Sequence, residues 1–261
     1  MNYYFATNIP DLRTEITLCN FASAQGDLSA NLLIHRAVTD GERWLVDCLG
    51  RLEPNASQTC SLPSSRPASG EMTLFFLFPT ELDQELATLP VRPDLMNTTP
   101  AWRANSRFAS ASTSVSFQGE YPDSMLKIPR GSLVSIGPME QATDDVRTHL
   151  IFTNVREKPA LLPGILLAKS MVSRKVIADI QIKSNQCNAW DITEIVRSTE
   201  ERLVLMSPDT AGIPLYFSHD AGMTAMSLEH THPPITLTMF GNADRRMGFV
   251  RQMKEYWLRD E

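Results

Sequence analysis

The sequence predicts a mostly β protein with two similar β-sandwich units, an irregular connecting segment and a C-terminal amphipathic helix. The first observation is that residues 17–76 and 151–205 follow the same order of short apolar runs and polar turn residues. Internal self-similarity of this kind is typical of a repeated structural unit. The second is that the runs are rich in Val, Ile, Phe and Thr and are broken by Gly, Pro, Asn and Ser, as strands and turns are.

Three pairs of polar residues mark the repeat. They are Asn20 and Asn154, Asp47 and Asp179, and Asn55 and Asn185. We interpret the first two pairs as turn and edge-strand hydrogen-bonding residues, because a duplication keeps a folding feature more readily than a site. A chain of 261 residues is long enough for two hydrophobic cores. The expected boundaries are 1–80 for the first sandwich unit, 81–147 for the connecting segment, 148–241 for the second unit and 242–261 for the helix.

The clearest local feature of the first unit is a hairpin. The dipeptide Asp40-Gly41 lies between strand-like runs at 31–38 and 43–49. Asp-Gly between two such runs is a strong hairpin pattern.

In the second unit, Ser173-Arg174 takes the same place between runs at 165–171 and 175–183. The second of these runs alternates, as a sandwich strand with one buried face does. The residues expected on the buried face are Val176, Ala178, Ile180 and Ile182.

The connecting segment begins with residues 81–89, which predict a short helix, and continues with several prolines that interrupt regular structure. Residues 125–136 predict two short strands around a turn at Pro129-Arg-Gly131.

After the second unit, runs at 212–218 and 223–228 predict a closing hairpin turned at residues 219–222. Asn242 is expected to cap a final helix over 243–259. The apolar residues of this helix repeat every three to four positions and include Met247, Val250, Met253 and Trp257. We expect this face to dock on the sandwich rather than on a membrane, because the basic face is partly balanced by acidic residues.

Composition excludes several classes of protein. The net charge is −6 and there is no basic block, which argues against nucleic-acid binding. No apolar run is long enough for a membrane span, and the N-terminus does not resemble a signal peptide. We therefore expect a cytoplasmic protein whose four cysteines are reduced, although Cys19 and Cys60 could meet across the first unit.

The richest cluster of chemical groups lies near the C-terminal hairpin. His219 and Asp220 are followed by Glu229, His230 and His232. His230 and His232 would share one face of a strand, and imidazoles with a nearby carboxylate can bind zinc or iron. The alternatives are histidines that bond to backbone carbonyls, catalysis without a metal, or a polar contact to a ligand.

A second candidate is the segment Ser116–Tyr121. Glu120 could act as a general acid or base, and Gln118 and Tyr121 are residue types that contact sugars. The alternative is a packed bulge in which Gly119 permits an unusual backbone angle while Phe117 and Tyr121 fill the core.

The leading hypothesis is a non-catalytic binding or scaffold protein without a cofactor, whose ligand is a carbohydrate or a partner protein. The alternative is a metal-dependent enzyme with zinc or iron at His219, His230 and His232. In it, Glu120 and Glu229 would be catalytic, and Asp220, Gln118 and Tyr121 would contact the ligand. A third possibility is a homodimer formed through a strand edge or the terminal helix.

Overall fold

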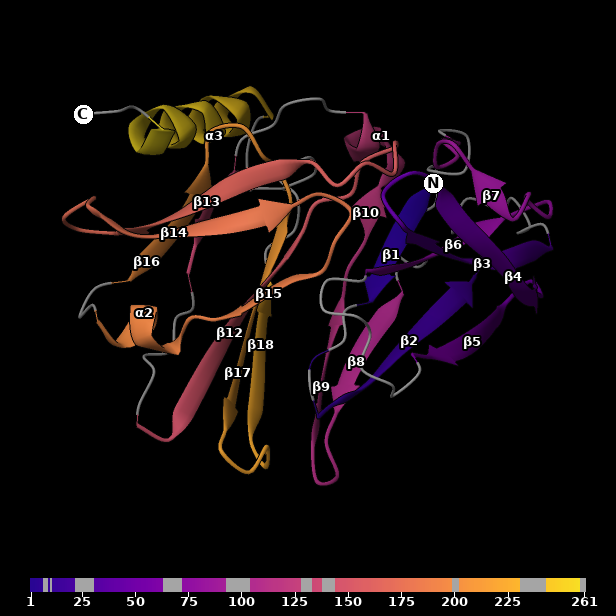
Figure 1. Ribbon diagram of the computed structural model, residues 1–261, viewed down its shortest axis with the longest axis horizontal. Coiled ribbons are helices and arrows are strands. Elements are labelled where there is room, and N and C mark those ends of the chain that lie inside the picture. The colour runs from indigo at the N-terminus through magenta and orange to yellow at the C-terminus, as the bar shows by residue number, and fades with distance from the viewer. Residues whose placement is uncertain are drawn as a thin grey trace. The chain divides into compact units, whose positions relative to one another are not determined.

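A computed structural model describes residues 1–6, 9, 11–21, 31–62, 72–92, 104–127, 133–137, 144–198, 202–230 and 243–258. Over these residues the chain forms four antiparallel sheets and three helices, the longest of them C-terminal (Figure 1). The predicted mostly β class and the C-terminal helix are therefore confirmed. The chain divides into two compact units, described here separately. Unit 1 comprises Met1–Ile128, Val155–Leu161 and Asn185–Cys187, and unit 2 comprises Pro129–Asn154, Leu162–Ser184 and Asn188–Glu261.

The larger sheet of unit 1 has the strand order β10-β1-β6-β3-β4-β7. Its strands are β1 (Asn2–Ala6), β3 (Leu32–Thr39), β4 (Trp44–Leu52), β6 (Thr73–Phe78), β7 (Glu85–Leu86) and β10 (Tyr121–Pro122). The predicted hairpin at Asp40-Gly41 is confirmed and joins β3 to β4. Asp40 Oδ1 accepts the N–H groups of Glu42 and Arg43, and Gly41 has a φ of 97°, where a glycine is favoured.

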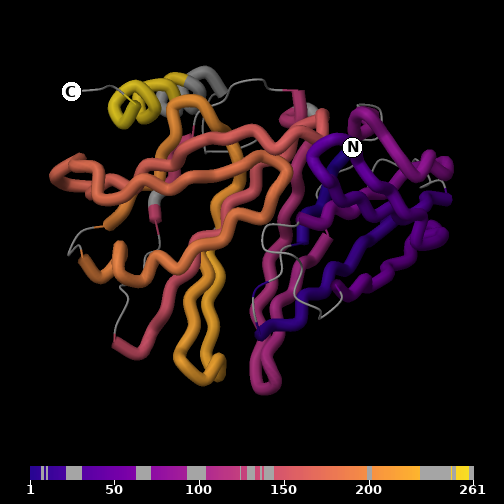
Figure 2. Tube along the Cα trace, in the orientation of Figure 1, coloured from indigo at the N-terminus to yellow at the C-terminus, as the bar shows by residue number. Residues whose placement is uncertain are grey.

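The smaller sheet of unit 1 has the order β5-β2-β8-β9. Its strands are β2 (Arg13–Asn20), β5 (Ala56–Ser61), β8 (Asn105–Ala109) and β9 (Ser114–Gln118). Figure 2 shows the magenta β8 beside the indigo β2, although the two are far apart in sequence. One hydrophobic cluster draws side chains from both sheets of the unit, including Tyr4, Ile16, Leu18, Ile34 and Phe75. The two sheets therefore share a core.

Unit 2 also has two sheets. One has the order β15-β12-β17-β18, with strands β12 (Val146–Thr153), β15 (Asn188–Asp191), β17 (Ile213–Asp220) and β18 (Met226–His230). The other has the order β11-β16-β13-β14, with strands β11 (Leu133–Ile136), β13 (Pro163–Ser170), β14 (Val176–Lys183) and β16 (Leu203–Ser207). Their shared core includes Leu150, Phe152, Leu166, Ile180 and Leu205. The predicted β13–β14 and β17–β18 hairpins are confirmed.

The strand order of unit 2 repeats that of unit 1. The order β5-β2-β8-β9 corresponds to β15-β12-β17-β18, and β1-β6-β3-β4 corresponds to β11-β16-β13-β14. Two of the paired asparagines occupy the same backbone conformation after the matching strands β4 and β14, because Asn55 has a φ of 58° and Asn185 a φ of 56°. Asparagine tolerates this left-handed region better than most residues.

The three helices are short or peripheral. They are α1 (Asp123–Leu126), α2 (Thr193–Arg197) and α3 (Ala243–Leu258). Helix α3 contacts β11 and β16 of unit 2, and Trp257 is buried. The expectation that this helix docks through an apolar face is therefore confirmed for Trp257. Its predicted cap, Asn242, lies outside the described residues.

Two local predictions are wrong. Residues 81–89 form no helix; instead β7 pairs with the edge of β4, and Val46 donates its N–H to the carbonyl of Gln84. A helix of this length has little intrinsic stability, so the bonds to the sheet edge decide the outcome. The first strand predicted within 125–136 overlaps helix α1, and its predicted turn at 129–131 lies outside the described residues.

The predicted alternation along β14 is only partly confirmed. Ile180 and Ile182 are buried, whereas Val176 is 49% exposed. The register with β13 shifts after Ala168, so that one residue of β14 has no partner. Such a bulge reverses the side on which the following residues point.

Part of the predicted connecting segment belongs to a sheet, because β8 and β9 pair with β2 and with each other. Conversely, unit 1 includes residues 155–161, which come from the second half of the chain. The carbonyl of Glu157 accepts the indole N–H of Trp44 and the N–H of Leu89, both at 3.0 Å. Trp44 has no exposed surface. We call residues 155–161 the strap.

The four cysteines are free thiols. Cys19 lies opposite Ser57 and Cys60 lies opposite Ile16, so the two cysteines are three positions out of register on β2 and β5. Residues three apart on a strand point to opposite faces, and the two thiols therefore do not meet.

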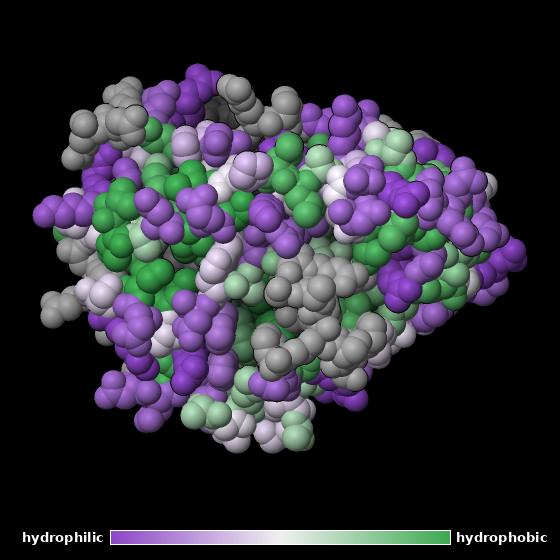
Figure 3. Space-filling model, viewed as in Figure 1, coloured by the Kyte–Doolittle hydropathy of each residue, from purple (hydrophilic) through white to green (hydrophobic). Residues whose placement is uncertain are grey.

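The surface mixes charged and apolar residues. Figure 3 shows apolar residues over the region of β13 and β14, among hydrophilic ones. The exposed apolar residues of this hairpin include Met171, Val172 and Val176. No helix in the described ranges has the length and hydropathy that a membrane span requires.

We predict that Asn185 is sensitive to replacement for two separable reasons. Its side chain bonds to the strap, accepting the N–H of Arg156 and donating to the carbonyls of Lys158 and Ala160. Asn185→Gly should lose about 1–3 kcal/mol of unfolding free energy, because these bonds are lost. Asn185→Ala should lose about 1 kcal/mol more, because alanine is strained at positive φ. Urea denaturation measures both values. Alanine and glycine variants of equal stability would contradict the second part, and the same pair at Asn55 is the matched control.

His35 is a buried polar residue on β3 of unit 1, beside Phe76 of β6. Its ring has no exposed surface and stacks on Phe76 with ring centroids 5.2 Å apart. Within the described part of the chain, neither ring nitrogen has a hydrogen-bond partner. Burial lowers the pKa of His35, because the charged imidazolium is poorly solvated there.

We predict that the protein loses unfolding free energy in acid because the pKa of His35 is lowered in the folded state. The unfolded chain takes up a proton on His35 near its usual pKa of about 6.5, whereas the folded chain does so only at lower pH. Unfolding free energy should therefore be highest above pH 7 and fall as the pH drops below about 6.5. His35→Leu should reduce this slope, as measured by urea denaturation at several pH values. An unchanged slope would show that His35 makes no contribution.

Candidate functional site

The structure separates the residues of the predicted metal site. His219 on β17 lies opposite Met226 on β18, whereas His230 lies opposite Leu215. The backbone positions of the two histidines are thus about 13 Å apart along the hairpin, at ~3.3 Å per residue. The side chain of His230 and the whole of His232 lie outside the described residues. Within the described ranges, no three His, Cys, Asp or Glu residues are placed to hold a metal ion.

Asp220 has a structural role in the turn after β17. Its carboxylate accepts the N–H groups of Thr224 and Ala225 and the hydroxyl of Thr224. These bonds, led by the Thr224 hydroxyl, hold the pKa of Asp220 below its usual value. Glu229 lies on β18 opposite Tyr216 and is half-buried.

The segment around Glu120 belongs to unit 1. It resembles the alternative prediction of a packed segment whose aromatic side chains fill the core. Tyr121 and Phe117 are buried, so neither ring is available to a sugar, whereas Gln118 is exposed. Glu120 accepts a hydrogen bond from the Asn2 side chain at 3.0 Å. Gly119 is required for a different reason from the one predicted: a Cβ there would lie 2.5 Å from the Phe117 ring, and its φ is not in the left-handed region.

His219 lies against His149, a residue that the sequence analysis did not single out. The Nε2 atoms of His149 and His219 are 3.1 Å apart, and the rings are parallel within 4°. His149 lies on β12 and His219 on the adjacent β17, in diagonal positions of the register. We call these two residues the His pair.

The hydrogen bonds fix the tautomers of the His pair. His219 Nδ1 lies 2.7 Å from the carbonyl oxygen of Asp220, and a carbonyl can only accept, so Nδ1 carries the proton. In a neutral ring, Nε2 of His219 is then an acceptor, and His149 must donate through its own Nε2. Both Nε2 atoms are occupied by this bond, and we do not assign His219 to a metal site.

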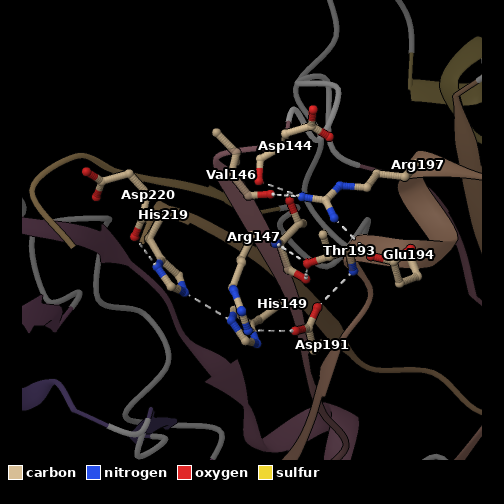
Figure 4. Close-up of polar contacts among 11 residues, drawn as sticks. Asp144, Val146, Arg147, His149, Asp191, Thr193, Glu194, Arg197, His219 and Asp220 are labelled. Carbon is tan, nitrogen blue, oxygen red and sulfur yellow. Dashed lines mark hydrogen bonds and ion pairs between the residues drawn. The ribbon is translucent and has the colours of Figure 1, made fainter. Parts of the chain in front are cut away.

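Asp191 lies next to His149, on the neighbouring strand β15. It is the register partner of His149 on β15, and its Oδ1 accepts the N–H of Thr193 at the start of α2. Arg147 Nη1 is 3.9 Å from its Oδ2. Burial alone would raise the pKa of Asp191, but the bonds from Thr193 and the charges of His149 and Arg147 together lower it. Figure 4 shows the His149 ring between His219 and Asp191.

A cleft of about 240 Å³ lies beside Asp191. The residues that line it are Asp144, Arg147, Asp191, Thr193, Glu194 and Arg197, all of unit 2. We call it the charged cleft. Three carboxylates face two guanidinium groups, so the lining offers both acceptors and donors and has a formal charge near −1. Arg197 is held in place by Glu194 at 2.9 Å and by the carbonyls of Asp144 and Val146.

Unit 1 provides an internal comparison for this site. Thr14 and Thr148 occupy matching positions, because their carbonyls accept the N–H of Leu62 and Ile192 respectively. By the same registers, His149 corresponds to Glu15, His219 to Ala109 and Asp191 to Ser61. Unit 1 therefore has the same strand order as unit 2 although it lacks counterparts of the His pair and of Asp191.

Burial lowers the pKa of His149, and the charges of His219 and Arg147 act in the same direction, whereas Asp191 raises it. The net effect is a pKa of His149 below its usual value. The sequence did not reveal this residue because its partners His219 and Asp191 lie on two other strands, β17 and β15. Comparing the matching positions of the two units singles it out, since unit 1 has Glu15, Ala109 and Ser61 at the places of the His pair and Asp191.

Comparison with known proteins finds no matching family, no matching curated protein and no matching solved structure.

Proposed function

We propose that this chain is a non-catalytic binding protein that takes a small, polar, hydroxyl-rich ligand such as a carbohydrate in the charged cleft of unit 2. The observation that carries the proposal is the cleft itself, lined by six polar or charged residues. Hydroxyl groups donate and accept, and a lining of carboxylates, guanidinium groups and a threonine can satisfy both functions. The proposed carbohydrate site is therefore this cleft and not the segment with Gln118 and Tyr121.

The scaffold of the proposal is a duplicated β-sandwich. Both units have the same order of strands and one core shared by two sheets. The paired residues Asn55 and Asn185 support a common origin, because both occupy a conformation that the fold needs at the same place. A site present in one copy and missing from the other is what specialisation after duplication would produce.

Titration with a panel of neutral mono- and disaccharides, followed through the amide NMR resonances of the protein, tests the proposal. At least one sugar should bind and shift the backbone resonances of Arg147, Asp191 and Thr193. Arg147→Gln should weaken that binding about tenfold, because a hydrogen bond from a charged donor contributes ~1.5 kcal/mol or more.

Arg36→Gln is the matched control for this experiment. Arg36 is exposed on β3 of unit 1 and pairs with Asp47, so its replacement should leave sugar binding unchanged. The absence of binding by every sugar, or shifts confined to unit 1, would overturn the proposal.

The metal-dependent enzyme stays an alternative hypothesis only for His230 and His232. We predict that zinc titration of the full chain at pH 7.5 gives no stoichiometric site that requires His219, because its two ring nitrogens are already bonded. Isothermal titration of the unmodified chain, His219→Gln and His230→Gln distinguishes the cases. Stoichiometric zinc lost in both variants would restore the predicted site. A protein partner, self-association and a cytoplasmic location stay predictions.

A further inference from the structure

We propose that the His pair is a one-proton switch, in which protonation of His149 draws the Asp191 carboxylate toward the imidazolium and weakens ligand binding in the charged cleft. The ligand step rests on the proposed function. The proton step is a property of the free protein and can be measured without any ligand.

The hydrogen bonds determine where the first proton goes. In the neutral pair, Nδ1 of His219 donates to Asp220 and Nε2 of His149 donates to Nε2 of His219. Nδ1 of His149 is the ring nitrogen that carries no proton in this arrangement. A proton from solvent adds there without breaking either bond. A second proton would have to enter at Nε2 of His219, where it would face the N–H of His149, so the inter-ring bond would be lost.

The groups around His149 determine how the new charge is balanced. Arg147 lies two residues away on β12, His219 lies on β17 and Asp191 lies on β15. Helix α2, which packs against β12, adds Glu194 and Arg197, and these two pair with each other. Asp220 is engaged by its own turn. Asp191 is therefore the carboxylate placed to receive the imidazolium.

Asp191 connects the His pair to the cleft because it belongs to both. It faces His149 across the strand pair, and it lines the cavity with Arg147 and Thr193. A carboxylate drawn to a neighbouring imidazolium is a weaker acceptor for a ligand hydroxyl. Unit 1 has Ser61 and Glu15 in the matching places and has no counterpart of this connection.

The test is an NMR titration of the ligand-free chain from pH 8 to pH 5, following the imidazole nitrogens and the Asp191 carboxyl carbon. His149 should carry its proton on Nε2 at high pH and take up one proton first. The Asp191 resonance should move with the same midpoint. The two protons of the pair should enter in separate steps, because the second one breaks the inter-ring bond.

His149→Gln is the matched variant, because its amide can still donate to His219 but does not titrate. In this variant the Asp191 resonance should stay flat over the step seen in the unmodified chain. For a sugar that binds, affinity should fall roughly fivefold or more from pH 7.5 to pH 5.5, and by less than about twofold in His149→Gln.

Independent titration of the two rings, or an Asp191 resonance that does not follow His149, would overturn the switch. A pH-dependent affinity that survives in His149→Gln would overturn it as well. If no sugar binds at any pH, the proposed function fails, while the titration of the free chain still decides the switch.

Discussion

The bond between the indole of Trp44 and the carbonyl of Glu157 is the constraint on which unit 1 depends. Trp44 is fully buried at the start of β4, and its N–H would have no acceptor if the strap were absent. The same carbonyl serves Leu89, and Asn185 holds the strap from its other side. Unit 1 is therefore completed by residues that follow β12 in the sequence, and the two compact units are not two consecutive stretches of chain.

Local turn chemistry explains the parts of the fold that the sequence predicted well. Asp40-Gly41 needs only its own side chain and a positive φ, so the hairpin follows from two residues. The predicted helix over residues 81–89 is wrong because the edge of β4 offers hydrogen bonds that a short helix could not match. Val176 was placed on the wrong face because a bulge is invisible to an alternating pattern.

The candidate site shows a deeper limit of reading one sequence. The sequence identifies His219 as a candidate site residue, but the residues near it in the chain are not the ones it contacts. The actual partner, His149, lies on another strand, and Asp191 lies on a third. Unit 1 has the same strand order but Glu15, Ala109 and Ser61 at the matching positions, so this strand order does not require the His pair or Asp191.

The strap also has a consequence for synthesis. A ribosome makes the strands of unit 1 first, but the acceptor for Trp44 is added only when residue 157 is translated, and Asn185 follows later still. Until that point the emerging chain carries an unfinished sheet with an uncovered indole. The N-terminal half is therefore exposed to chaperones and to other nascent chains for longer than its own length implies.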